Sequence, residues 1–135
     1  MEDFLVLLLS ISAGTIGYLM AIFWFQPILK YREIKGQIIS DLLFYDNAIS
    51  SKGVNNDMIK RVLDRSISNR ERAADLTTSY NIFPRLYKKC LLFRKEYPDR
   101  ASFELIGLSN TEDFDEARQY IKQIQIFLRI KPPIV

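Results

Sequence analysis

The sequence of 135 residues contains no histidine and only one cysteine, Cys90. A single thiol cannot form an intramolecular disulfide, and a structural zinc ion needs several cysteine or histidine ligands. Nucleophilic arrangements that pair serine or cysteine with histidine are excluded because the sequence has no histidine. Cys90 lies between Lys89 and Leu91, and we interpret it as a partly buried residue on an apolar helix face rather than a reactive thiol.

Glycine and proline are also scarce, with five of each, so the chain is neither disordered nor collagen-like. The glycines are scattered and form no phosphate-binding loop. One cluster of carboxylates, at positions 112, 113, 115 and 116, lies where acidic residues favour a helix N-terminus through the helix dipole. We therefore expect no enzymatic activity, with no catalytic residue, no cofactor and no metal site.

Charged residues are missing from positions 4 to 29. The apolar segment 4–25 has 22 residues. As a helix it would measure about 33 Å, enough to cross a hydrocarbon core of about 30 Å. A buried core helix is disfavoured because the rest of the chain is too short to surround it, and the acidic start Glu2-Asp3 is unlike a cleaved signal peptide. We expect a retained transmembrane helix.

All 19 lysines and arginines follow this segment, while Glu2 and Asp3 precede it. Because basic residues hold their end of a span in the cytoplasm, we expect the N-terminus to lie outside and the part of the chain that follows the span to lie in the cytoplasm. Residues 1–27 would form the anchor and residues 28–135 a cytoplasmic domain. The residues expected at the membrane interface, in contact with lipid, are Trp24, Lys30, Tyr31, Arg32 and Lys35.

Small side chains recur within the apolar segment at Ser10, Gly14, Gly17 and Ala21, with spacings of 4, 3 and 4. Such a stripe lets two helix backbones approach closely in a membrane, and its period favours a left-handed crossing. We expect this small-residue stripe to mediate transmembrane packing, either with further copies of the chain or with another membrane protein.

Apolar residues recur at helical spacing over 28–49, 57–80, 85–96, 100–108 and 111–128. With no β-type alternation, the predicted class is all-α: an N-terminal transmembrane helix followed by a small cytoplasmic helical bundle. Residues 50–56 are predicted to form a loop, with Asn55 or Asn56 capping the next helix, and Ser109 with Glu112 fits a capping box for the last one. Pro27 is expected either to kink a continuous helix or to start a new one.

The densest basic group follows Pro84 and contains Arg85, Lys88, Lys89, Arg94 and Lys95. Such a group attracts anionic lipid, yet a solvated positive surface beside a membrane would have the same composition. Nucleic acid would also be attracted through its phosphates, although we favour this partner less.

Three short runs carry a resemblance to a known group of proteins: QPILKYREIKG at 26–36, SDLLFY at 40–45 and ELIGLSN at 104–110. They resemble a family of small, largely uncharacterised bacterial single-pass membrane proteins. The resemblance implies a bacterial single-pass protein of the inner membrane with a helical cytoplasmic domain, and it brings no catalytic residues. Short membrane proteins of this architecture also act as effectors in bacterial antiviral defence.

The sequence thus predicts a non-enzymatic single-pass membrane protein that acts by helix-mediated oligomerisation, as a membrane-perturbing effector of a bacterial defence system. The alternative is an accessory subunit or membrane anchor that tethers a cytoplasmic partner protein. A membrane-tethered nucleic-acid binder is a third, less favoured hypothesis.

Overall fold

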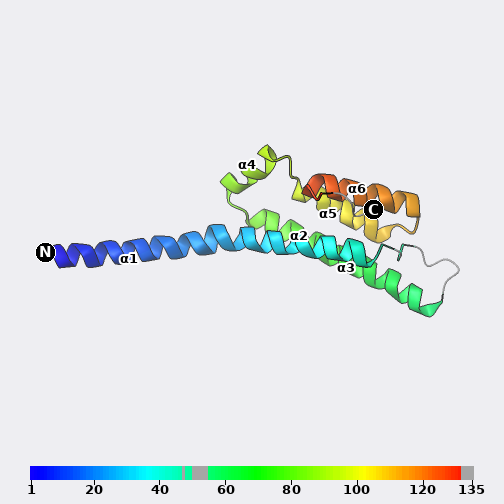
Figure 1. The fold of residues 1–135 in the computed structure, drawn as a ribbon, viewed down its shortest axis with the longest axis horizontal. Helices are drawn as coiled ribbons and strands as arrows, with labels where there is room; N and C mark the ends of the chain where they lie inside the picture. The colour runs from blue at the N-terminus through cyan, green and yellow to red at the C-terminus, as the bar shows by residue number, and fades with distance from the viewer. Residues whose placement is uncertain (47, 50–54, 132–135) are drawn as a thin grey trace.

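The computed structural model describes residues 1–46, 48–49 and 55–131. Over these residues the secondary structure is helical and includes no strand, which confirms the predicted all-α class (Figure 1). Of the predicted loop at 50–56, residues 50–54 lie outside the described part of the chain. The elements are α1 (Glu2–Met20), the π-helical turn η1 (Ala21–Phe25), α2 (Gln26–Phe44), α3 (Asn56–Ile82), α4 (Arg85–Phe93), α5 (Pro98–Asn110) and α6 (Phe114–Leu128).

The first three elements form one continuous helix of 43 residues, Glu2–Phe44. Pro27 therefore does not start a separate helix. In a regular α-helix its ring would clash with the carbonyl of Phe23, four residues earlier. The wider π turn directly before it relieves this clash, with the Gln26 N–H donating to the carbonyl of Ala21, five residues back.

The second half of this long helix contributes one face to a hydrophobic core. Tyr31, Ile34, Ile38 and Leu42 of α2 are buried, as their spacing of 3, 4 and 4 predicts. Helix α3 packs against both α2 and α5, and α5 packs against α6. Buried residues of α3 to α6 complete the core, among them Leu76, Leu91, Leu105, Leu108, Ile124 and Leu128. We call α2 to α6 the packed helices.

The helix ends confirm one predicted cap and correct another. Asn55 caps α3, its side chain accepting a hydrogen bond from the Met58 N–H. The predicted capping box of Ser109 and Glu112 is wrong, because Ser109 lies inside α5 and donates its hydroxyl to the Ile106 carbonyl at 2.7 Å. Helix α6 instead begins after Asp113, whose carboxylate accepts from the two N–H groups of Asp115 and Glu116.

One glycine lies where α5 packs closely on a side chain of α6. A Cβ on Gly107 would lie 2.4 Å from a ring carbon of Tyr120, so a larger residue there requires the Tyr120 ring to move. Gly36 in α2 has no such neighbour, since no atom lies within 4 Å of the position that its Cβ would take.

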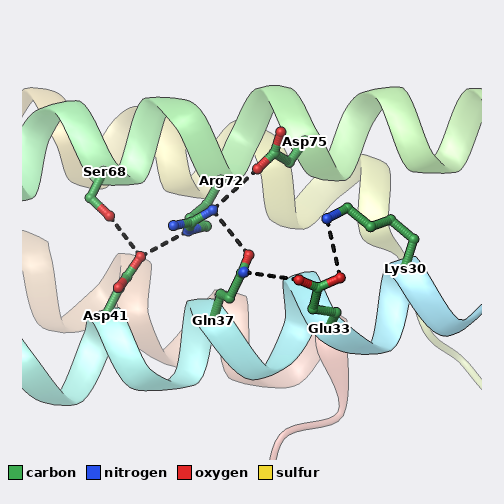
Figure 2. Close-up of polar contacts among 7 residues, drawn as sticks. All are labelled: Lys30, Glu33, Gln37, Asp41, Ser68, Arg72 and Asp75. Atoms are coloured by element: carbon green, nitrogen blue, oxygen red, sulfur yellow. Dashed lines mark hydrogen bonds and ion pairs between the residues drawn. The ribbon is translucent and has the colours of Figure 1, made fainter.

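A polar network centred on Arg72 joins α3 to α2 (Figure 2). The Arg72 Nε–H donates to Asp41 at 2.9 Å, and its Nη1 donates to Gln37 at 3.0 Å. Asp41 also accepts the hydroxyl of Ser68 at 2.6 Å. The bond to Asp41 raises the pKa of Arg72, so its guanidinium stays charged while half-buried between the helices.

We predict that Arg72→Ala lowers the free energy of unfolding of the packed helices by about 1–3 kcal/mol, because Asp41 and Gln37 lose a charged donor. Chemical unfolding of the detergent-solubilised full chain, followed by circular dichroism, measures this loss. Lys60→Ala changes an exposed basic residue of the same helix and is expected to cost much less. Equal effects of the two changes would contradict a stabilising role for the network.

Candidate functional site

The N-terminal half of the long helix contacts none of the packed helices closely enough to bury a residue. Within this fully described stretch, no residue of α1 or η1 is buried. In Figure 1 it extends away from the packed helices as a single rod. The helix is long and apolar enough to cross a membrane. An apolar surface of this extent is unusual on a soluble monomer and marks a surface that another apolar phase or molecule covers.

The small-residue stripe lies on this exposed rod. Apart from the adjoining residues and the backbone of the same helix, no atom lies within 4 Å of the place that a Cβ would take on Gly14 or Gly17, so the surface beside both glycines is open. The Ser10 hydroxyl donates to the Val6 carbonyl at 2.8 Å and is thereby satisfied within its own helix. Ser10, Gly14, Gly17 and Ala21 are all exposed, and the stripe therefore offers a smooth surface for a second helix.

The five residues expected at the membrane interface divide into two groups. Trp24, Lys30 and Arg32 are exposed on the long helix, where they are accessible to lipid headgroups. Tyr31 and Lys35 instead face the packed helices: Tyr31 is only 2% exposed, and Lys35 forms an ion pair with Glu96 at 2.9 Å. They are thus placed to hold the packed helices together rather than to meet lipid.

A buried carboxylate, Glu96, fastens the long helix to the connection between α4 and α5. Glu96 is 2% exposed and accepts hydrogen bonds from the Tyr31 hydroxyl and the Lys35 ammonium on the same oxygen. Its other oxygen lies 3.5 Å from the guanidinium of Arg94. Lys95, just before it, adopts a left-handed conformation with φ 56°, which ends α4 and turns Glu96 inward.

Sequence reasoning placed Glu96 at the end of a helix and missed this role. Only the turn before Pro98 hinted that the chain changes direction there. Burial, and then the hydrogen bond to Glu96, raises the pKa of Tyr31 well above its ordinary value. The phenol therefore remains a proton donor to Glu96 at physiological pH.

The basic group at 85–95 does not form one uniform surface. Arg85, Lys89 and Lys95 are exposed, whereas the Lys88 ammonium lies over the Tyr80 ring at 4.8 Å. The remaining member, Arg94, pairs with Glu96 as described. Cys90 is exposed as well, so the expectation of a partly buried thiol is wrong. Helix α4 buries only Leu91 fully, and most of its surface is left uncovered.

A second basic surface, which sequence reasoning missed, is an open groove along α6. Five basic residues and Asp46 contribute to its lining. Arg118 and Lys122 lie a helical turn apart on α6, whereas Arg129 and Lys131 follow the C-terminal end of that helix and Arg94 follows α4. The basic residues that line it are Arg94, Arg118, Lys122, Arg129 and Lys131.

Two of the four carboxylates at 112–116 stabilise the start of α6. Asp113 accepts from two backbone N–H groups, and Glu116 accepts the hydroxyl of Thr111. Among the residues that the structure describes, no group of three or more histidine, cysteine, aspartate or glutamate side chains is placed to hold a metal ion.

Comparison of the chain with protein-family models, with curated proteins and with solved structures finds no match.

We predict that Glu96→Ala lowers the free energy of unfolding by about 2–4 kcal/mol, since the Tyr31 hydroxyl and the Lys35 ammonium lose their acceptor. Glu96→Gln keeps a carbonyl acceptor for Tyr31 and should cost clearly less. Unfolding of the full chain in detergent measures both, with Glu71→Ala, an exposed site on α3, as the control. If all three variants unfold alike, Glu96 does not fasten the helices.

Proposed function

We propose that this chain is a non-enzymatic, single-pass inner-membrane protein that acts by assembling with further copies of itself. The observation that carries the proposal is the division of one continuous helix. Its apolar half, with no residue buried, suits a hydrocarbon environment, and its other half belongs to the packed helices. Exposed Lys30 and Arg32 follow the apolar half and favour a cytoplasmic location for the packed helices.

Assembly within the membrane would use the small-residue stripe. Between helices in lipid there is no hydrophobic driving force, so close van der Waals packing decides which faces meet. The open surface at Gly14 and Gly17 lets a neighbouring backbone approach more closely than the surrounding leucines would. In bacterial antiviral defence, such assembly would perturb the inner membrane and stop growth of the infected cell.

Because α1, η1 and α2 are continuous, a rotation of the span within an assembly would turn the packed helices with it. The bonds from Tyr31 and Lys35 to Glu96 and from Arg72 to Asp41 support this coupling. The stimulus for assembly could therefore reach the span from the cytoplasmic side through the same helix.

We predict that Gly14→Leu with Gly17→Leu disperses the assembly, because two bulky side chains separate the helix backbones. Cysteine-independent cross-linking in membranes and growth of expressing cells measure assembly and toxicity. Ser12→Leu with Thr15→Leu adds similar bulk to the opposite side of the helix and serves as the matched control.

Both double variants should remain in membranes after alkaline carbonate washing, which separates loss of assembly from loss of insertion. Undiminished cross-linking of the Gly14 and Gly17 variant would reject assembly through the stripe. Release of the parent chain by carbonate, or digestion of its C-terminal part by protease added to intact spheroplasts, would reject the membrane topology itself.

The second candidate function is that of an anchor that tethers a cytoplasmic partner protein. It is favoured by an apolar stripe on α3, where Ile59, Leu63 and Ile67 follow each other at spacings of 4 and are all exposed. Apolar residues at this spacing form one side of a helix that a groove or helix of another protein can cover.

Under this second function, Ile59→Ser, Leu63→Ser and Ile67→Ser together should abolish co-purification of the partner from solubilised host membranes. The triple variant should still associate through its span, because the stripe in the membrane is untouched. Phe103→Ser with Ile106→Ser, at exposed apolar residues of α5, is the control. A partner retained equally by all three proteins would exclude docking on α3.

A further inference from the structure

We infer that the outward face of α4 docks on the surface of the membrane and binds anionic phospholipid. This face is defined by Leu86, Lys89 and Phe93, spaced 3 and 4 residues apart, with Arg85 beside them. The inference rests on the proposed membrane anchoring and adds a second, peripheral contact between the packed helices and the lipid.

The composition of this face is typical of an interfacial helix. Leu86 is 58% exposed and Phe93 is 91% exposed, while the exposed Arg85 and Lys89 supply positive charge next to them. The opposite side of α4 holds the buried Leu91. Helices of this kind lie at the boundary between headgroups and acyl chains, with apolar side chains inserted and basic ones bound to anionic lipid.

The position of α4 agrees with this role. The residues that flank α4 both contact Tyr31 of the long helix: the Phe83 ring packs edge-to-face on the Tyr31 ring at 5.4 Å, and Glu96 accepts its hydroxyl. Tyr31 lies about 9 Å along the helix axis from Phe25, the last residue of the apolar segment 4–25. In Figure 1, α4 accordingly lies at the end of the packed helices that is nearest to the apolar rod.

The apolar surface continues from the long helix toward α4. Pro27, Leu29 and Ile82 line a shallow groove where α2 meets the C-terminal end of α3, and Ile82 lies three residues before α4 begins. Leu29 and Ile82 are both exposed. A lipid surface that covers the end of the span would therefore reach this groove and the outward face of α4 together.

The position of this face favours lipid over nucleic acid. Basic residues beside an exposed aromatic ring also bind single-stranded nucleic acid, whose bases stack on such rings. This face, however, lies at the end of the packed helices that is nearest to the apolar rod, where a membrane surface would meet it (Figure 1). The groove along α6 is also positively charged, but most of its lining residues belong to α6 and its C-terminal end and not to α4. It therefore serves as a control for the effect of charge alone.

Cys90 provides a site-specific reporter, because it is the only cysteine and lies exposed on α4. A nitroxide attached to it in the full chain reports its depth through relative collision with oxygen and with a water-soluble nickel complex. The labelled chain is reconstituted into vesicles of phosphatidylcholine alone and into vesicles that also contain phosphatidylglycerol. We expect the nitroxide to be shielded from nickel in the second vesicles and less so in the first.

Arg85→Glu with Lys89→Glu should weaken docking on phosphatidylglycerol vesicles at least about 25-fold, since each basic residue near an anionic surface contributes a factor of about five. Phe93→Ser should weaken it in both kinds of vesicle. Arg118→Glu with Lys122→Glu makes the same change of charge in the α6 groove and should leave the nitroxide shielded.

A nitroxide equally open to nickel in both vesicles, on a chain that resists carbonate washing, would overturn the docking of α4 and leave the membrane anchor intact. Release of the chain by carbonate would instead overturn the proposed function, and the inference with it. Shielding that depends on protein density and not on phosphatidylglycerol would show that α4 contacts protein, and would equally overturn the proposal. Circular dichroism confirms that each variant is folded.

Discussion

The structure depends on one constraint: two halves of different composition and burial belong to a single continuous helix. Its first half is apolar on every side and buries no residue, whereas its second half is apolar on one side and forms part of the core. A break between the halves would free the packed helices to turn relative to the apolar rod. The π turn before Pro27 avoids that break, because it accommodates the proline ring without ending the helix.

Polar contacts then determine how the other helices are fastened to this rod. Burying a carboxylate such as Glu96 costs solvation free energy, which the Tyr31 hydroxyl and the Lys35 ammonium offset. Arg72 and Asp41 act similarly between α3 and α2, at a half-buried site. Because these bonds are directional, they restrict the rotation of the long helix about its axis, relative to the other packed helices, more than apolar contacts alone would.

This arrangement separates three surfaces that different partners could occupy. The small-residue stripe lies on the apolar rod, the exposed stripe of Ile59, Leu63 and Ile67 lies on α3, and the outward face of α4 lies at the end of the packed helices nearest to the rod (Figure 1). The proposed assembly, partner capture and lipid docking would therefore use different residues. Since all three surfaces are fixed to one rod, an event at one of them can change the orientation of the others.

The sequence by itself determined the features that depend on neighbouring residues. The uncharged run at 4–29 predicted the exposed apolar helix, the spacing of Ile34, Ile38 and Leu42 predicted the buried side of α2, and Asn55 was one of two expected caps. Each follows from helix periodicity or from a bond within one turn.

Only the tertiary structure decided which sides of the helices meet. It buried Tyr31 against Glu96, 65 residues away. It also left Cys90 exposed and brought the ring of Tyr120 close to Gly107. These outcomes depend on contacts between residues that are far apart in sequence, and such contacts are set by the packing of whole helices rather than by local pattern.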